Sequence, residues 1–222
     1  MERSVERTNF FYLLLALLIL LVAVPLNDDF IVGSPPLVKA ILFSLVLVVG
    51  VRSLKGGGRF LTAGMVFVVA GVILAIVSTR THLLFFQYAS LLSLIGFLLV
   101  AITYTMKQVA IGTEITTNRL VGAICVYLLL GVIWALSYSV LELAAPGSFA
   151  GVHAWSDRGW DSEWLYFSFV TMTTLGYGDL LPISTTARAM AYMQAVFGLF
   201  YIAILVAGLV GAYIAQEGKP QQ

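Results

Sequence analysis

The residues best suited to chemistry lie in one short segment, Leu175-Gly176-Tyr177-Gly178-Asp179, which follows Thr173 and Thr174. Its alternating glycines disfavour a helix and permit backbone conformations that other residues resist. An ion that loses its hydration shell needs closely spaced oxygen ligands. The backbone carbonyls of an extended strand, with the Thr174 hydroxyl below them, supply such oxygens at regular intervals. The segment therefore predicts a cation site built mainly from backbone oxygens.

Other kinds of reactive site find little support in the sequence. The only histidines, His82 and His153, are isolated, whereas a zinc or iron–sulfur site needs clustered Cys, His or carboxylate ligands. The single cysteine, Cys125, lies in an apolar run, which favours a small buried hydrophobe over a reactive thiol. An intramembrane enzyme is an alternative class, but no Ser–His pair and no paired membrane carboxylates support it. We expect no catalytic residue and no cofactor.

The composition indicates a membrane protein. Of the 222 residues, 60% are hydrophobic and 10% are charged, whereas a soluble domain is about 45–50% apolar and about 25% charged. The chain has 12 Lys and Arg against 11 Asp and Glu, a formal net charge of +1, so no bulk charge favours nucleic acid. The lipid bilayer is the expected environment, and no nucleic acid or soluble partner is expected.

Several segments are long and apolar enough to cross a bilayer, which takes about 20 residues of helix because each residue rises about 1.5 Å. The second is the weakest, since Lys39 interrupts it and must extend its ammonium group to the interface. A cleaved secretory signal is the alternative for the first, but no small-x-small cleavage site follows it. The six predicted spans are residues 9–26, 36–53, 60–79, 83–106, 120–143 and 186–214.

The basic residues favour a cell-membrane protein with both termini in the cytoplasm, because cytoplasmic loops are enriched in Lys and Arg. In that orientation four of the twelve lie outside, namely Lys39, Arg80, Arg158 and Arg188. The other eight lie inside: Arg3, Arg7, Arg52, Lys55, Arg59, Lys107, Arg119 and Lys219.

Between the last two spans, residues 164–174 are aromatic and apolar but only about half the length needed to cross. Asp161 or Ser162 is a suitable N-cap, so we expect a short helix that enters the membrane and stops. Non-helical backbone at membrane depth is tolerated only where protein buries it or water reaches it, which predicts a re-entrant pore loop. The negative end of the short helix would favour a cation. Because one strand cannot surround an ion, several chains must converge on an axis.

The motif in this loop resembles the signature of tetrameric potassium channels, whose filters carry a Thr-Val-Gly-Tyr-Gly loop. It differs at Leu175, where valine is more usual. The resemblance implies that the carbonyl of this residue would face the ion while its side chain would pack behind the filter, so we expect altered packing more than altered ligand chemistry. The matching stretch is Thr171-Met172-Thr173-Thr174-Leu175-Gly176-Tyr177-Gly178-Asp179-Leu180-Leu181-Pro182.

The resemblance implies a role for each residue of the filter segment, residues 174–178. Asp179 would lie at the outer mouth, paired with Tyr166, which is in register and has a hydroxyl able to donate. Val170 stands where some family members carry a second carboxylate, so their inactivation behaviour does not transfer. The implied potassium ligands are the carbonyls of Thr174, Leu175, Gly176 and Tyr177 and the Thr174 hydroxyl, with Gly178 completing the filter.

Two further positions acquire expected roles from the resemblance. Glu142, near the outer end of the fifth span, would brace the outer pore, the alternative being that it rests at the interface. Gly198 lies twenty residues after Gly178, where related channels often carry a hinge glycine. Close helix packing is the alternative for Gly198, as it is for Gly208 and Gly211 in the same span.

The fourth predicted span argues against voltage sensing. Voltage-gated channels carry arginines at every third position there, but residues 83–106 contain no Lys or Arg. Moving one charge through 100 mV supplies only about 2.3 kcal/mol, so a span without charges cannot drive steep gating. We therefore predict little intrinsic voltage dependence.

Together these features predict an all-α membrane protein with six transmembrane helices, a re-entrant pore helix and an extended filter. Residues 1–118 would form a four-helix domain without a charged sensor plus a linker, 119–215 the pore domain, and 216–222 a short cytoplasmic tail. The predicted function is a homotetrameric, potassium-selective channel that conducts K⁺ passively. The alternatives are a weakly selective cation channel and a non-conducting channel subunit.

Overall fold

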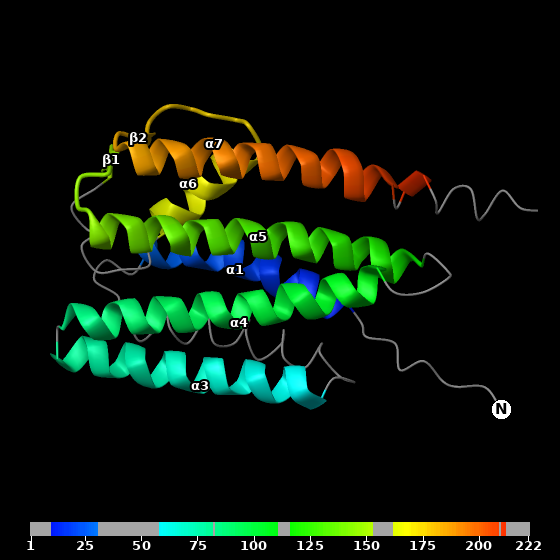
Figure 1. Cartoon of the computed structure of the whole chain (residues 1–222), viewed down its shortest axis with the longest axis horizontal. Coiled ribbons are helices and arrows are strands. Elements are labelled where there is room, and N and C mark those ends of the chain that lie inside the picture. The colour runs from blue at the N-terminus through cyan, green and yellow to red at the C-terminus, as the bar shows by residue number, and fades with distance from the viewer. Residues whose placement is uncertain are drawn as a thin grey trace, which may run out of the picture. The chain divides into compact units, whose positions relative to one another are not determined.

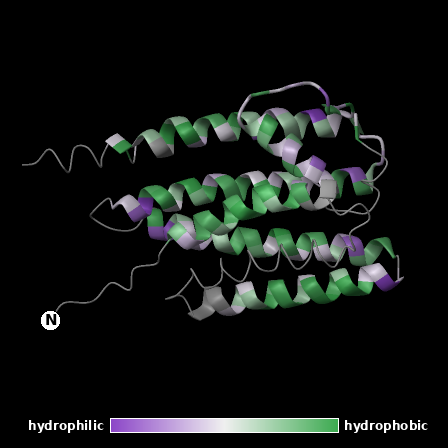
Figure 2. Ribbon diagram, turned by 180° about the vertical axis from the view of Figure 1, so that it is seen from behind, coloured by the Kyte–Doolittle hydropathy of each residue, from purple (hydrophilic) through white to green (hydrophobic). Residues whose placement is uncertain are grey.

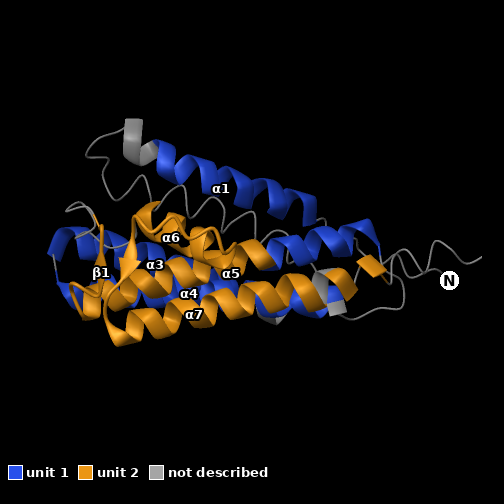
Figure 3. Ribbon diagram, turned by 90° about the horizontal axis from the view of Figure 1, so that it is seen from above, with its two compact units in different colours: residues 1–126 blue, residues 127–222 orange. Residues whose placement is uncertain are grey.

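The computed structural model describes residues 10–30, 58–81, 83–110, 116–152, 162–208 and 210–211. The chain divides into two compact units, residues 1–126 and 127–222, and the boundary falls inside one long helix, α5 (Figure 3). The described elements are α1 (Phe10–Phe30), α3 (Gly58–Thr81), α4 (Leu84–Ala110), α5 (Thr117–Ala144), β1 (Phe149–Ala150), α6 (Ser162–Met172), β2 (Leu181–Pro182), α7 (Thr185–Phe200) and the π-helix η2 (Tyr201–Val206) (Figure 1).

Four of the described helices are long and apolar enough to span a membrane: Thr62–Thr81, Leu84–Val109, Thr117–Ala144 and Thr185–Ile204. They coincide with the third to sixth predicted spans, so the prediction of a mostly helical membrane protein is confirmed. Hydrophobic residues cover most of each helix, and hydrophilic ones gather toward the helix ends (Figure 2). The second predicted span, residues 36–53 with Lys39, lies outside the described residues.

The first predicted span ends later than the sequence indicates. We expected residues 9–26, followed by a turn at Asn27-Asp28-Asp29, but α1 continues through Pro25 and this triplet to Phe30. Local turn propensity is a weak preference, and each residue added to an existing helix gains a backbone hydrogen bond. The apolar part of α1, Phe10–Leu26, is shorter than the four spans.

Within the first unit, α3 packs along α4. The Ser93 hydroxyl of α4 donates to the carbonyl of Phe67 in α3 at 2.8 Å. The Phe67 ring also packs closely on Gly96 of α4, because a Cβ atom added to this glycine would lie only 2.7 Å from the ring. At the start of α1, the Phe10 amide donates to Asn118 Oδ1 at 3.0 Å. These contacts hold α3 against α4 and the beginning of α1 against the beginning of α5.

In the second unit, a small sheet joins the chain after α5 to the chain before α7. β1 and β2 pair antiparallel, with Phe149 opposite Pro182. The Ser148 carbonyl extends the pairing, since it accepts from the amides of Ile183 at 2.8 Å and Ser184 at 3.1 Å. The all-helical prediction missed this sheet, because two-residue strands carry no periodic pattern. It fixes the point from which α7 starts.

The last predicted span is interrupted. We expected one helix over residues 186–214, but α7 gives way after Phe200 to a π-helix. A π-helix has i→i+5 hydrogen bonds and is rare outside short insertions in α-helices. The predicted end of the span lies outside the described residues.

Gly151, directly after β1, packs against the backbone of Asp179 and Leu180, which follow the filter segment. Substituting it therefore tests how tightly the β1–β2 sheet holds these residues. The φ of Gly151 is +83°, and an added Cβ atom would collide with the Asp179 carbonyl oxygen. Gly147 is the matched control, since its φ is +84° but its Cβ would meet nothing within 4 Å. Both alanine variants incur about 1–2 kcal/mol of backbone strain. Gly151→Ala adds a steric cost of about 1–3 kcal/mol.

We therefore expect Gly151→Ala to lower the melting temperature in detergent clearly more than Gly147→Ala does. Thermal unfolding of the two purified variants beside the unmodified protein measures the difference. Equal melting temperatures for the two variants would contradict the close contact between Gly151 and Asp179.

Candidate ion-conducting site

The helix α6, expected from the sequence as the pore helix, has the predicted half length. Its 11 residues extend about 16 Å at ~1.5 Å each, against a hydrocarbon core of ~30 Å. Ser162, one of the two residues expected as the N-cap, is the first residue of the helix. Asp161, the other one, lies outside the described residues. Phe149 packs edge-on against Trp164 and Phe167, at ring-centroid distances of 5.0 and 5.4 Å. The helix is thus held by aromatic contacts to the strand β1.

The C-terminal end of α6 leads directly into the filter segment. The last four carbonyls of any α-helix lack an amide partner within the helix. In α6 each of these four carbonyls accepts a hydrogen bond from a group beyond the helix. Phe169 O accepts from the Thr173 amide, and Met172 O accepts from the Tyr127 hydroxyl at 3.5 Å. The other two bonds are Leu175 N to Val170 O at 2.9 Å and Thr174 N to Thr171 O at 3.1 Å. This crossed pair is a Schellman motif.

Thr174 occupies the left-handed position of this motif, with φ +59°. Glycine usually fills that position, and a β-branched residue there is an outlier, so the backbone is strained by about 1–3 kcal/mol. Gly176 (φ +57°) and Gly178 (φ +80°) repeat the left-handed conformation, while Leu175 and Tyr177 do not have positive φ. Such alternation turns successive amides to one side, and hence successive carbonyls to the other.

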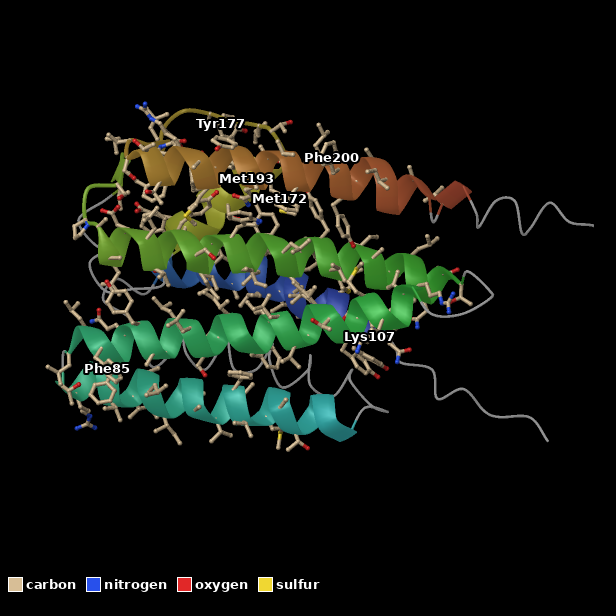
Figure 4. The ribbon with its side chains drawn as sticks, in the orientation of Figure 1. Phe85, Lys107, Met172, Tyr177, Met193 and Phe200 are labelled. Carbon is tan, nitrogen blue, oxygen red and sulfur yellow. The ribbon has the colours of Figure 1, made fainter. Side chains whose placement is uncertain are left out.

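The carbonyl oxygens of the filter segment are left open. Across the described part of the chain, no hydrogen bond reaches the backbone oxygens of residues 174–178. The side chains of Leu175 and Tyr177 are 55% and 69% exposed in the single chain, and Tyr177 is labelled on this loop in Figure 4. A row of aligned, unpaired carbonyls can coordinate a dehydrated cation.

The hydrogen bond predicted between Tyr166 and Asp179 is present. The Tyr166 hydroxyl donates to Asp179 Oδ2 at 2.5 Å, and the Leu180 amide donates to Oδ1 at 3.0 Å. The bond from Tyr166 is the main reason that the pKa of Asp179 lies below its usual 3.8. The same bond raises the pKa of Tyr166 to about 12. Asp179 therefore keeps its charge at neutral pH, directly after the filter segment.

Glu142 accepts hydrogen bonds through both carboxylate oxygens. Oε1 accepts from the Gly147 amide at 2.7 Å and Oε2 from the Phe149 amide at 3.3 Å. The carboxylate thus holds the turn between α5 and β1. Its support of the outer pore stays a prediction.

Gly198 lies where α7 approaches the end of α6. A Cβ atom there would be 2.8 Å from the Met172 carbonyl oxygen, so the glycine permits close packing, the alternative weighed from the sequence. Its role as a hinge stays a prediction. Gly208 and Gly211 have nothing within 4 Å of a built Cβ in this chain.

A buried polar cluster that contacts α6 was not predicted from the sequence. Gln194 of α7 and Ser168 of α6 are fully buried, and they link to Tyr138 and Gly131 of α5 through hydrogen bonds of 2.6–3.0 Å. Gln194 is a single amide in an apolar stretch of helix, and such residues often hydrogen-bond across helices in membranes. That signal was available in the sequence, but the partners were not.

Comparison with known proteins agrees with this geometry. Residues 120–215 match a family described as "Ion channel". The chain is 33% identical over 82 residues to the inward rectifier potassium channel Kirbac3.1 of Paramagnetospirillum magnetotacticum, covering 35% of this chain and 24% of the relative. It is 37% identical over 100 residues to two pore potassium channel a of Oryza sativa subsp. japonica, covering 45% and 25%.

A third relative, two-pore potassium channel 3 of Arabidopsis thaliana, is 44% identical over 46 residues, covering 21% of this chain and 11% of the relative. The chain therefore spans a quarter or less of the length of these relatives. No solved structure matches it. The apolar spans indicate a multi-pass membrane protein, and residues 120–215 are similar to ion channels. The relatives named above are potassium channels.

The Tyr166–Asp179 bond predicts a pH dependence of stability. A carboxyl whose folded pKa is depressed stabilises the fold above its unfolded pKa, and this contribution is lost as the pH falls through the folded pKa. We expect Tyr166→Phe to melt at a lower temperature than the unmodified protein at neutral pH. The difference should shrink as Asp179 is protonated below about pH 4. Melting curves of both proteins from neutral to acid pH test this, and a difference that is constant with pH would contradict it.

Proposed function

We propose that the protein conducts K⁺ selectively and passively through its Thr-Leu-Gly-Tyr-Gly segment. The observation that carries the proposal is the alternating left-handed backbone at Thr174, Gly176 and Gly178. The carbonyls of this segment have no hydrogen-bond donor among the residues that the structure describes. The ligands are the carbonyls of residues 174–177 and the Thr174 hydroxyl, and Gly178 completes the filter. The names of the relatives, all potassium channels, support this choice of ion.

A homotetramer supplies the remaining walls of the pore. One extended strand cannot surround an ion, and the chain contains the motif once. The Leu175 side chain is 55% exposed in a single chain, and neighbouring copies would cover it. Apolar side chains exposed along α7 suit contacts with further copies and with lipid; examples are Tyr192, Phe197 and Phe200, at 61%, 56% and 56% exposure.

The proposed setting is the cell membrane, with both termini in the cytoplasm. This orientation places Asp179, the Glu142 turn and the β1–β2 sheet on the outer side. Asp179 then contributes negative charge at the outer mouth, where it favours the approach of cations. The basic residues counted from the sequence support this orientation.

Gly176→Ala tests the filter, with Gly147→Ala as its matched control. Both glycines have positive φ and open space around a built Cβ, so both substitutions cost about 1–2 kcal/mol through the backbone alone. Only Gly176 belongs to the filter segment. In potassium-loaded liposomes we expect the unmodified chain and Gly147→Ala to pass K⁺ and Rb⁺ but little Na⁺, and Gly176→Ala to lose most of its K⁺ flux.

The outcomes of the flux measurement separate the alternatives. Equal Na⁺ and K⁺ flux in the unmodified protein would identify a weakly selective cation channel. Leu175, which stands where valine is more usual, would then be the first residue to test as the cause. No flux from a correctly assembled protein would identify a non-conducting subunit. Undiminished selective flux through Gly176→Ala would place the filter elsewhere.

The structure of α4 bears on gating by voltage. The helix extends beyond the predicted limit of residue 106 and so includes Lys107, in its last turn. A basic residue at the end of a span crosses little of the membrane field. We propose that the channel has no steep voltage dependence. Conductance recorded across a reconstituted bilayer should change less than about tenfold over 100 mV, and a change of several hundredfold would overturn this.

A further inference from the structure

The buried cluster around Gln194 has a complete and directional set of hydrogen bonds. Gln194 Nε2 donates to the Ser168 carbonyl at 3.0 Å and to Ser168 Oγ at 2.7 Å. Gln194 Oε1 accepts from the Tyr138 hydroxyl at 2.6 Å, and Ser168 Oγ donates to the Gly131 carbonyl at 2.6 Å. A backbone carbonyl can only accept, so the amide nitrogen must face Ser168. The orientation of Gln194 is therefore fixed.

This cluster is aligned with the contact at the end of the pore helix. Ser168 lies four residues before Met172 on α6, and Gln194 lies four residues before Gly198 on α7. Gln194 meets Ser168, and Gly198 meets Met172; Figure 4 labels Met172 and, beside Gln194 in sequence, Met193. Two contacts one helical turn apart on both helices fix the register of α7 on α6. Met172, in the second contact, lies two residues before Thr174, the first residue of the filter segment.

The two contacts differ in how they respond to movement. Apolar packing at Gly198 weakens gradually as helices separate, whereas the amide loses its partners once they exceed hydrogen-bonding distance. Gln194 and Ser168 are completely buried, so partners lost there are not replaced by water. A displacement of α7 must then either carry α6 with it or break the cluster.

We propose that Gln194 is a positioning residue of the filter: it ties α7 to the middle of α6, so that the conducting geometry of the filter depends on the position of α7. The inference rests on the proposed potassium conduction. Gln194 touches no ion and acts through Ser168 and the helix that carries the filter.

Three variants test this role. Gln194→Leu keeps the approximate size and removes every hydrogen bond of the amide. Ser93→Ala is the matched control, because it removes a different interhelical bond, from Ser93 Oγ to Phe67 O at 2.8 Å, far along the chain from the filter segment. Gln194→Glu keeps the hydrogen-bonding groups when protonated, because its O–H can donate to Ser168 and its carbonyl can accept from Tyr138.

The readout is the ratio of K⁺ to Na⁺ permeability, from bi-ionic reversal potentials of assembled protein. We expect Gln194→Leu to lower this ratio on the order of tenfold, equivalent to about 1.4 kcal/mol, and Ser93→Ala to leave it unchanged even if the melting temperature falls. A purely structural role would lower the melting temperature without moving the ratio.

Gln194→Glu supplies a test within a single sample. Among the described residues facing this side chain, Tyr138 on α5 is the titratable one, and Ser168 on α6 does not ionise. Burial favours the neutral carboxylic acid, so the permeability ratio should match the unmodified protein at acid pH. It should fall as the pH rises and the acid ionises, because a carboxylate cannot donate to the Ser168 carbonyl. The unmodified protein, measured at each pH, accounts for other titrating groups.

The outcomes are separable from those of the proposed function. If the unmodified protein passes no K⁺, the proposed function fails first. If it is selective and assembled Gln194→Leu keeps the same ratio, the inference is overturned while the channel remains. If Gln194→Leu does not assemble, Gln194→Glu decides, with ionisation of the introduced acid followed by the loss of its carboxylic-acid infrared band as the pH rises. A reversible loss of selectivity that accompanies ionisation supports the role, and a ratio that still follows the unmodified protein once the acid has ionised overturns it.

Discussion

The structure around the filter segment depends on one constraint: a backbone carbonyl that is shielded from water needs a hydrogen-bond partner. At the end of α6, local amides from the turn pair three of the four terminal carbonyls, and Tyr127 reaches the fourth. The carbonyls that follow have no protein donor among the described residues. The strained φ of Thr174 marks the change from one state to the other. Two sets of contacts hold α6, whose end leads into Thr174. They are the aromatic contacts of Phe149 and the hydrogen bonds of the buried Gln194 amide.

Local patterns were sufficient for much of the fold. The apolar runs located the described spans, and the short aromatic run located α6, because helix length and hydropathy are properties of contiguous residues. The Tyr166–Asp179 bond was also predictable, since the resemblance supplied its register. The end of α1 was predicted wrongly, because the turn-forming Asn27-Asp28-Asp29 was given more weight than helix continuation.

What the sequence could not provide are contacts between distant residues. Gln194 and Ser168 are 26 positions apart, and Gln194 and Tyr138 are 56 apart; nothing in the spacing pairs them. The contact of Gly151 with Asp179 is similar, because a glycine after two apolar residues is an ordinary turn signal until the backbone opposite it is known. The left-handed conformation of Thr174 is the reverse of what its β-branched side chain prefers. Such features depend on tertiary packing rather than on local preference.

The π-helix η2 changes which face of the helix the described residues after Val206 occupy. Each wide turn takes in one residue more than an α-turn, and one residue corresponds to about 100° of rotation about the axis. Side chains beyond Val206 therefore lie on a different face from the one that an uninterrupted continuation of α7 would give them. The 7-residue and 11-residue repeats of a continuous α-helix therefore cannot be used to decide whether Gly208 and Gly211 share a face with Gly198. A one-residue deletion within Tyr201–Val206 would restore these repeats and rotate the remainder of the helix.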